Sequence, residues 1–350
     1  MSILIQNHKI FMKKIIIPIA VSLLFSFQSC KKNDSSSKNV AELAKIEDVW
    51  IHLEEFQKIA DNNNNNRAVG SPGGIASAEY ITNIIKNLGL QPTIQEFKNQ
   101  DGKLGKNIII EIKGESNKVS MIGAHYDSVE SGPGINDNAT GTSILLEILN
   151  KIQKNKIVPK NTLRFAFWDA EETGVAGSKF YVSQLKTSDF QNIAHYINID
   201  MVGTKNPTLL ILDGDGSSWE KQEKDLLATA TTEEEKKSRK DMIAVLKKAY
   251  PPQVKGADEL EKIFADYLTS KKIPFSDDYL LSNNTDVFGF LGKVPTFGIV
   301  MTNEQTLDNG ELLFAPCYHQ KCDDIKNVDK GSIKLALDSI LHLLTKIGIG

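Results

Sequence analysis

Apolar residues in the first part of the folded chain follow two alternating spacings. Helical spacing, with apolar residues every three or four positions, predicts helices at 46–56, 74–88, 141–152 and 177–185. Continuous or alternating apolar runs predict strands at 93–97, 107–112, 118–124, 162–168 and 194–199. Apolar strands that alternate with helices are typical of an α/β sheet covered on both faces.

After residue 200 the pattern is less regular. Residues 208–212 predict a short strand at a sheet edge, 294–300 predict the last clear strand, and 330–346 predict a final helix capped near Asp329. Residues 218–272 are charge-rich and helical, with a capping box at Thr232–Glu235 and a stop at Pro251–Pro252. We expect this helical excursion to pack on the sheet and to rim a cleft. The fold class expected for residues 45–350 is therefore a single α/β domain with a central, mostly parallel mixed sheet flanked by helices on both faces.

The N-terminal segment does not have the pattern of a folded element. Lys13 and Lys14 precede an apolar run at 15–27, which is too short to span a membrane and is followed by polar residues. We expect residues 1–29 to be a signal peptide whose true start is Met12, with Cys30 as the lipidated first residue and 30–44 as a flexible tether. The alternative is a plain cleaved signal with an incidental cysteine. The expected location is the bacterial cell envelope, on the periplasmic side or the cell surface, with membrane attachment through the lipid alone.

Charge and cysteine content narrow the functional classes. The formal net charge of −3 gives no indication of a nucleic-acid partner. Of the three cysteines, Cys317 and Cys322 flank His319 in the stretch PCYHQKCDD. This arrangement is compatible with a soft metal site, a redox pair or a disulfide loop, and an exported chain with an even number of remaining cysteines favours the disulfide.

Potential metal ligands follow several of the predicted strands. The motifs GAHYDS, GINDNATG, WDAEETG and INIDMVG, together with PCYHQKCDD, supply His125, Asp127, Asp137, Glu171, Glu172, Asp200 and His319. Sites in open α/β sheets form beyond the carboxyl ends of the strands, so we expect these side chains to meet at one edge. Two histidines and three carboxylates exceed the needs of one tetrahedral zinc and suit a pair of ions that share a bridging carboxylate. Such a pair would acidify a shared water and polarise a substrate carbonyl, and a further carboxylate would serve as general base.

Each of these carboxylates has an ordinary structural explanation when it is considered alone. Asp127 fits a turn, Asp137 a helix cap, and Glu171–Glu172 a solvated helix start. These explanations do not account for five segments that end at the same edge of one sheet. Other acidic and histidine residues keep the ordinary explanation, as turn residues or as surface or core histidines: Asp169, Asp213, Asp215, His195 and His342.

The ordered series HYDS, NDNATG, EE-x-G-x-x-GS, NIDM and CYHxxCD within residues 121–324 resembles the secreted bacterial two-zinc aminopeptidases of peptidase clan MH. The leading RAVGSPG and the final helix fit the same frame. The resemblance implies the zinc-exopeptidase fold and hydrolysis of the N-terminal bond of peptides with a free N-terminus. It also implies two Zn²⁺ per chain: His125 and Asp200 on one ion, Glu172 and His319 on the other, and Asp137 between them.

The resemblance implies roles for further residues. Glu171 would be the general base, Tyr318 would stabilise the oxyanion, and Asp127 would hydrogen-bond His125 and fix its tautomer. Asp286 follows Thr285 where the family has Ser-Asp, and it is a candidate to lie behind the ligands. Some family members carry the same Cys-Tyr-His…Cys loop, which supports a disulfide that restrains the loop rather than two thiolate ligands.

Other functions remain open at this level. Glutaminyl-peptide cyclotransferases share the fold and a similar site with one zinc, and dipeptidases or carboxypeptidases share the ligands. A non-catalytic binding module would have lost ligands or the base, and none is missing. We expect a monomer without a nucleic-acid partner.

Overall fold

The computed structural model describes residues 44–249, 254–278, 281–306 and 312–350. The predicted signal peptide, the predicted lipidation site Cys30, most of the tether and the predicted stop at Pro251–Pro252 lie outside these residues. Within the described part of the chain, none of the helices is long and apolar enough to cross a membrane.

Among the described residues, eight strands form one mixed sheet in the order β1-β2-β4-β3-β5-β8-β6-β7. Neighbours are parallel in the centre, from β4 through β3 and β5 to β8, and β1, β2 and β6 run antiparallel to the neighbours that join them to this centre. A small separate hairpin pairs β9 with β10. The bounds of the strands are β1 Thr93–Lys98, β2 Leu104–Ile112, β3 Ser116–His125, β4 Asn161–Trp168, β5 Ile193–Asp200, β6 Thr208–Leu212, β7 Phe275–Asp278, β8 Thr296–Thr302, β9 Gln305–Thr306 and β10 Leu312–Leu313.

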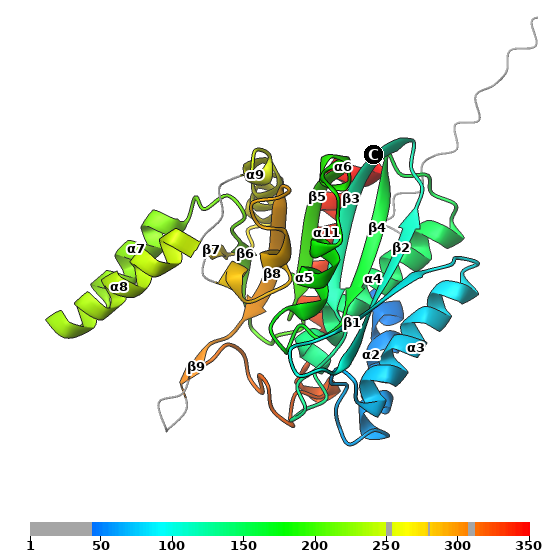
Figure 1. Cartoon of the computed structure of the whole chain (residues 1–350), viewed down its shortest axis with the longest axis horizontal. Helices are drawn as coiled ribbons and strands as arrows, with labels where there is room; N and C mark the ends of the chain where they lie inside the picture. Colours follow the sequence, from blue (N-terminus) through cyan, green and yellow to red (C-terminus); the bar gives the residue numbers. More distant parts are fainter. Residues whose placement is uncertain (1–43, 250–253, 279–280, 307–311) are drawn as a thin grey trace, which may run out of the picture. The chain divides into compact units, whose positions relative to one another are not determined.

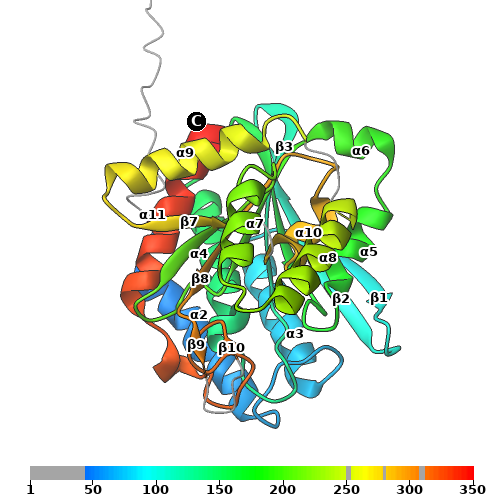
Figure 2. The ribbon, with the colours of Figure 1, turned by 90° about the vertical axis from the view of Figure 1, so that its left-hand side faces the viewer.

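Helices cover both faces of the sheet (Figures 1 and 2). Their bounds are α2 Ile46–Asp61, α3 Pro72–Asn87, α4 Thr140–Lys154, α5 Ala176–Ser183, α6 Thr187–Asn192, α7 Trp219–Ala228, α8 Glu233–Ala249, α9 Ala257–Ser270, α10 Val287–Phe290 and α11 Lys330–Leu344. Short helical turns lie at Ile135–Ala139, Leu281–Asn283, Ile325–Asn327 and Thr345–Ile349.

Two hydrophobic cores lie on opposite faces of the sheet because successive strand residues point to opposite sides. In β2, Ile108 and Ile110 join the larger core with α2, α3, α4, α9 and α11. Ile109 between them joins the smaller core, where Tyr181 of α5 and Phe290 of α10 pack. The expected α/β sheet with helices on both faces is confirmed.

The central parallel strands bring their carboxyl ends to one edge of the sheet. His125 at the end of β3 pairs in register with Trp168 at the end of β4. Asp200 at the end of the neighbouring strand β5 pairs with Val300 of β8. This shared register places the residues that follow three adjacent strands beside one another.

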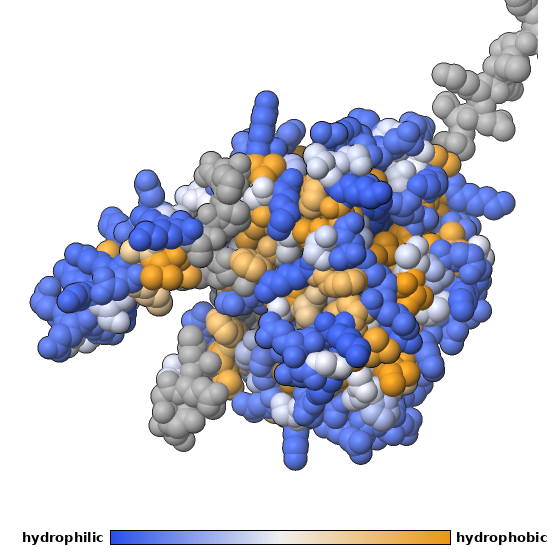
Figure 3. Space-filling model, viewed as in Figure 1, coloured by the Kyte–Doolittle hydropathy of each residue, from blue (hydrophilic) through white to orange (hydrophobic). Residues whose placement is uncertain are grey.

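One expectation for the second half of the chain is wrong, and another is confirmed only in part. The strand β6 does not lie at the sheet edge, because β7 pairs with it in parallel from Phe275 to Asp278. Among the described residues of the excursion 218–272, α9 packs on β8, and α7 reaches β7 through Gln222 Nε2, which donates to the Asp277 carbonyl at 3.2 Å. The helices α7 and α8 pack on each other in a cluster of their own around Trp219 and Ile243. In Figure 3, hydrophilic side chains cover the outer end of this helix pair.

The predicted capping box at the start of α8 is present in a variant form. The Thr232 hydroxyl accepts from the backbone N–H of Glu235 at 3.1 Å. The Glu235 carboxylate accepts from the backbone N–H of Thr231, at 2.7 Å, rather than from that of Thr232. The final helix α11 is capped as expected, with the Asp329 carboxylate accepting from Ser332 at 2.8 Å.

Candidate metal centre

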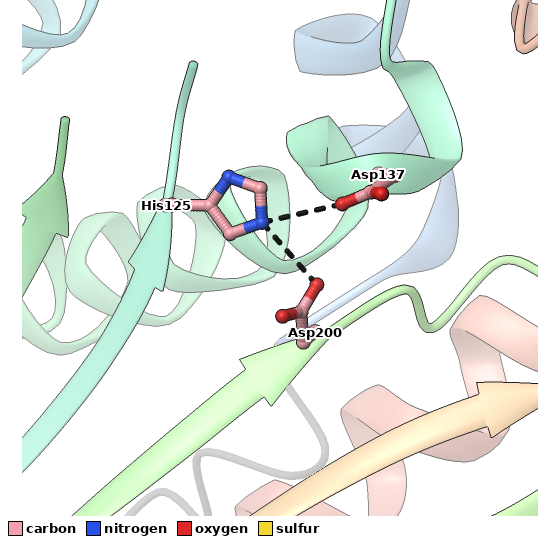
Figure 4. Close-up of side chains that lie close together, drawn as sticks. All are labelled: His125, Asp137 and Asp200. Atoms are coloured by element: carbon pink, nitrogen blue, oxygen red, sulfur yellow. Dashed lines mark ion pairs between the residues drawn. The ribbon is translucent and has the colours of Figure 1, made fainter. Parts of the chain in front are cut away.

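His125, Asp137 and Asp200 form the first of two side-chain groups at the carboxyl ends of the central strands. The Nε2 atom of His125 lies 3.2 Å from Oδ1 of Asp137 and 3.4 Å from Oδ1 of Asp200. Figure 4 shows the two carboxylates converging on this one ring nitrogen. His125 is only 1% exposed, so the group lies beneath the surface.

His319, Asp137 and Glu172 form the second group. The Nε2 atom of His319 lies 3.0 Å from Oε2 of Glu172 and 3.3 Å from Oδ2 of Asp137. The side chain of His319 is 39% exposed, so this group opens toward solvent. Asp137 thus belongs to both groups, with one carboxylate oxygen directed at each histidine.

The donor atoms of both groups fit divalent zinc. Imidazole nitrogens and carboxylate oxygens are zinc ligands, and the ligand atoms of each group lie within 4.8 Å of one another. Nε2 of His125, Oδ1 of Asp200 and Oε1 of Glu172 are buried, yet none of them has a hydrogen-bond partner in the described protein. Buried polar atoms without partners are costly, and one bound cation in each group would satisfy all three.

The electrostatics of the two groups favour positive charge. Burial alone would keep the His319 imidazole neutral, but its hydrogen bonds with Asp137 and Glu172 outweigh burial and raise its pKa to about 10. Burial likewise pushes the pKa of Asp137 upward, but the two histidines outweigh that effect and hold it below its ordinary range. A metal ion that binds here therefore displaces protons from these side chains.

Asp127 fixes the backbone of the two adjacent glutamates. Its two carboxylate oxygens accept from the backbone N–H groups of Glu171 and Glu172, at 3.1 and 3.3 Å. The same carboxylate lies 3.4 Å from Nδ1 of His125. One buried side chain therefore contacts both the strand end that carries His125 and the loop that carries the glutamates.

The glutamates lie in a turn between β4 and α5, not at a helix start as the ordinary explanation proposed. Glu172 belongs to the second group, whereas Glu171 belongs to neither group and lines the adjoining pocket. Burial raises the pKa of Glu171 well above its ordinary range, and the positive field of His125 opposes this only in part. The carboxylates of Asp286, Glu172 and Asp200 add to the rise.

A pocket of about 300 Å³ adjoins the two groups. One wall is acidic and is formed by Asp137, Glu171, Glu172 and Asp200. The apolar residues that also line the pocket form its apolar wall: Val175, Met201, Leu281, Val300 and Phe314. Among the described residues that line it, none is a lysine or arginine.

Tyr318 lies between the second group and the apolar wall. Its ring stacks on the His319 imidazole, with centroids 3.7 Å apart, and meets Phe314 edge-on. Burial raises the pKa of its phenol well above the ordinary range, and the nearby carboxylates act in the same direction. The phenol therefore keeps its proton and remains a hydrogen-bond donor.

The disulfide expected in PCYHQKCDD is present. Cys317 and Cys322 are bonded, with their Cα atoms 5.3 Å apart. The next residue, Asp323, belongs to the same motif, but the sequence pattern assigns it no role. Its buried carboxylate accepts from the backbone N–H groups of Asn136 and Asp137, at 3.0 and 3.1 Å. It thereby ties the cysteine loop to the turn that presents Asp137.

Sequence reasoning also gave no role to Arg67, which lies fully buried under the loop between β3 and Asp137. One signal in the sequence points to Arg67 and Asp323, because each stands inside one of the motifs. This signal does not reveal the partner, because the contacts of both residues join segments far apart in the sequence.

The acidic and histidine residues with an ordinary explanation lie outside both groups. His195 is buried in β5, and His342 stacks on Tyr267. Asp169 accepts hydrogen bonds from Tyr126 and from the Lys106 backbone.

Asp213 accepts hydrogen bonds within its own turn, from Asp215 and Ser218. It forms a third acidic group with Asp215 and Glu261, away from the pocket.

A larger hollow of about 760 Å³ lies elsewhere, over β1, β2 and β4. An ion pair between Arg164 and Glu111 lies in its wall. It contains none of the histidines or carboxylates of the two groups, so size alone does not locate the site.

Comparison with known proteins agrees with this geometry. Residues 107–344 match the family described as Peptidase family M28. The chain is 32% identical over 258 residues to an aminopeptidase of Pseudomonas aeruginosa, covering 69% of this chain and 42% of that protein. The chain spans less than two thirds of the length of the first curated relatives that it matches.

Solved structures share the fold at low sequence identity. An aminopeptidase from Aneurinibacillus sp. strain AM-1 superposes with a TM-score of 0.66 at 14% identity, covering 89% of this chain and 96% of that one. The glutaminyl cyclase of Porphyromonas gingivalis gives 0.62 at 16% identity, with 87% and 99% covered. The fold alone therefore does not separate a peptidase from a cyclase.

Proposed function

The chain belongs to peptidase family M28, and from this premise we propose that it is a two-zinc aminopeptidase. The substrate would be a peptide with a free N-terminus, and the bond hydrolysed would be the first peptide bond. The observation that carries the proposal is a pair of histidine–carboxylate groups that share Asp137 at the wall of a pocket with an acidic side. Asp200 and His125 would hold one ion, and Glu172 and His319 the other.

The chain's own residues supply the remaining chemistry. Bound zinc ions would polarise the scissile carbonyl and acidify the attacking water. Glu171 lines the pocket without belonging to either ligand group, so it is placed to take a proton from the attacking water and return it to the leaving amine. Tyr318 keeps its phenolic proton and donates it in a hydrogen bond to the oxyanion that forms on the substrate carbonyl.

The lining of the pocket favours an aminopeptidase over a carboxypeptidase or dipeptidase. An enzyme that reads a C-terminal carboxylate needs a cationic partner for it, such as arginine. The described lining residues include no lysine or arginine that could pair with such a carboxylate. The apolar wall with Met201, Val300 and Phe314 is suited to an apolar N-terminal side chain.

The glutaminyl cyclase alternative needs only one zinc. The group of His125, Asp137 and Asp200 is as tightly assembled as the group with His319, and its buried nitrogen and oxygen lack other partners. A single-zinc enzyme would leave these atoms without a function. We therefore favour hydrolysis over cyclisation.

Metal analysis with an activity panel tests this proposal. We expect close to two zinc ions per chain, hydrolysis of aminoacyl chromogenic amides, and no action on N-blocked peptides. One zinc per chain with cyclisation of N-terminal glutamine would establish the cyclase instead. Glu171→Gln should lower kcat about 10³-fold without loss of zinc, whereas the exposed Glu130→Gln in a neighbouring loop is the matched control.

We further infer that the mature protein is exported and anchored by a lipid on Cys30. The signal-like segment from Met12 to Cys30 supports this, as does the disulfide, since disulfides persist in oxidising compartments. Metabolic labelling with a radioactive fatty acid should mark the wild type and not Cys30→Ser. Release of unlabelled wild-type protein into the medium would instead indicate a plain cleaved signal.

A further inference from the structure

Arg67 is one of the largest fully buried side chains among the described residues. It stands in the loop between α2 and α3, in the motif RAVGSPG. Ser71 caps α3 by accepting from Gly74 at 3.0 Å. A Cβ atom on Gly73 would lie 2.0 Å from the carbonyl oxygen of Asn66. The first turn of α3 can therefore pack directly against the backbone at Arg67 only because glycine stands there.

Arg67 joins the loop of residues 126–134 through its backbone and its side chain. The Arg67 backbone N–H donates to the Ser128 hydroxyl at 2.8 Å. Its guanidinium donates to three backbone carbonyls: Nε to Pro133 at 2.9 Å, Nη2 to Gly134 at 2.5 Å, and Nη1 to Tyr126. One planar group thus holds both ends of the same loop.

These two ends adjoin the proposed metal ligands. Tyr126 follows His125 directly, and Gly134 precedes Asp137 by three residues. We propose that Arg67 is a positioning residue of the metal centre, which sets the separation of His125 and Asp137 by clamping the loop between them. The inference rests on the proposed zinc function and adds to it a residue that touches neither metal nor substrate.

The charge of Arg67 supports the same role. Burial lowers its pKa to about 10, and the carboxylates of Asp127, Asp323, Asp137 and Glu172 oppose that shift, so the side chain stays charged at neutral pH. A buried cation reduces the mutual repulsion of these carboxylates. The guanidinium also lies 5.1 Å from the centroid of the Phe56 ring, which closes its other side.

Two substitutions of Arg67 distinguish a positioning role from a role in packing alone. Arg67→Met keeps most of the volume and removes the charge and all three side-chain hydrogen bonds. Arg67→Lys keeps the charge but cannot reach three carbonyls with a planar fork. A purely structural arginine would lower thermal stability in both variants and leave the zinc affinity of the folded protein unchanged.

Arg164 provides the matched control. It is also largely buried and hydrogen-bonded, to Glu111 at 2.9 Å and to Tyr181 at 2.6 Å, but it lies in the hollow away from the site. Arg164→Met removes an equivalent guanidinium. It should therefore lower the melting temperature of the protein without changing its zinc affinity.

The experiment measures zinc dissociation constants of the purified proteins by competition with a chromogenic chelator, beside their melting temperatures. We expect the weaker of the two constants to rise 10- to 100-fold in Arg67→Met and at least 3-fold in Arg67→Lys, and to stay within 2-fold in Arg164→Met. A folded Arg67→Met with wild-type constants would overturn the proposal. If Arg67→Met does not fold, unchanged constants in Arg67→Lys would overturn it equally.

The readout distinguishes this inference from the proposed function. Wild-type protein that binds no zinc would refute the proposed function and this inference together. Wild-type protein that binds zinc, with constants insensitive to Arg67, would refute only the role of the arginine. Because binding is measured without substrate, the outcome does not depend on which peptide the enzyme prefers.

Discussion

The disulfide loop that carries His319 has an unfavourable backbone conformation at two of its residues. Cys317 and His319 have φ values of 65° and 57°, in the left-handed region that residues with a Cβ rarely adopt. Each such residue costs roughly 1 kcal/mol or more, so about 2 kcal/mol favours relaxation of the loop. Hydrogen bonds within and around the loop oppose this, among them Ser131 Oγ donating to the His319 carbonyl at 2.7 Å and the Gln320 N–H donating to the Cys317 carbonyl at 3.0 Å.

The Cys317–Cys322 bond contributes a restraint of similar size. It closes a ring with a sequence separation of 5. The chain-entropy relation for such a short ring gives roughly 2 kcal/mol at 25 °C. The restraint and the backbone cost therefore nearly balance, and removal of the bond should leave the His319 conformation only partly populated.

The double variant Cys317→Ser, Cys322→Ser tests this balance. A loss of about 2 kcal/mol corresponds to a rise of about 30-fold in the zinc dissociation constant of the group that contains His319. The group that contains His125 should change less than 3-fold, because His125 and Asp200 end the strands β3 and β5, outside the cysteine loop. Titration with a chromogenic chelator resolves the two constants, and wild-type protein that has been reduced and alkylated should behave like the variant.

Two outcomes would refute this reasoning. Zinc constants within 2-fold of wild type would mean that the hydrogen bonds alone hold His319 in place. Equal weakening of both groups would mean that the bond stabilises the domain as a whole rather than the loop. Far-UV circular dichroism establishes beforehand that the sheet is intact in the variant.

Three further predictions concern residues around the site and in the core. Tyr318→Phe should lower kcat about 100-fold with KM within about 3-fold, because the substitution removes one donor to the oxyanion; steady-state kinetics that show an unchanged kcat would contradict that role. Asp323→Asn should lower the free energy of unfolding by about 1–3 kcal/mol in urea titrations, since an NH2 group, which is a donor, replaces one of the two oxygens that accept from the backbone N–H groups of Asn136 and Asp137. Burial lowers the pKa of His195 to about 4. Between pH 6.5 and 4, His195 therefore binds a proton in the unfolded chain but not in the folded chain. Stability should therefore fall by roughly 3 kcal/mol on acidification through this window, and the fall should be smaller in His195→Gln. Equal acid sensitivity in wild type and His195→Gln would contradict the assignment.

The sequence was informative where one local hydrophobic pattern predicts both a strand and its position in the centre of the sheet. The apolar runs that became β3, β4 and β5 are buried on both faces, which is typical of central parallel strands. The residues after such strands meet at one edge, so the apolar runs alone predict that His125 and Asp200 lie together. The hydrophobic pattern thus predicted that these two residues share one sheet edge, and in the structure Nε2 of His125 and Oδ1 of Asp200 lie 3.4 Å apart.

The sequence was misleading where an element depends on a distant partner. The strand β7 has the sequence FSDD, which shows no apolar alternation, so β6 seemed to lie at the edge. The helices α7 and α8 are amphipathic, but an apolar stripe does not reveal whether it will face a sheet or another helix. The pocket accordingly has no described lining residue from 218–272, contrary to the expectation that this segment rims the cleft.

The roles of Arg67 and Asp323 could not be predicted for a related reason. Each side chain binds backbone groups in a segment far away in the sequence, at 126–134 and at 136–137. Every residue has a backbone carbonyl, and every residue except proline a backbone N–H, so the sequence does not show which of these groups a distant side chain will bind. A charged residue that binds such groups therefore stands in a motif without a role that the sequence explains.

The adjacent glutamates show how the same limit applies inside a motif that was recognised. Because Glu171 and Glu172 are adjacent, their positions in the sequence do not distinguish their roles. Both side chains would be solvated if they began a helix. The helix begins only at Ala176, after a turn in which Ala170 and Val175 have positive φ. Asp127 fixes both glutamate N–H groups inside that turn, so neighbouring side chains leave the backbone in different directions. The Glu172 carboxylate then lies 3.0 Å from Nε2 of His319, whereas Glu171 lines the pocket without joining that group. This arrangement would let the proposed ligand stand beside the proposed base without competing for the same ion.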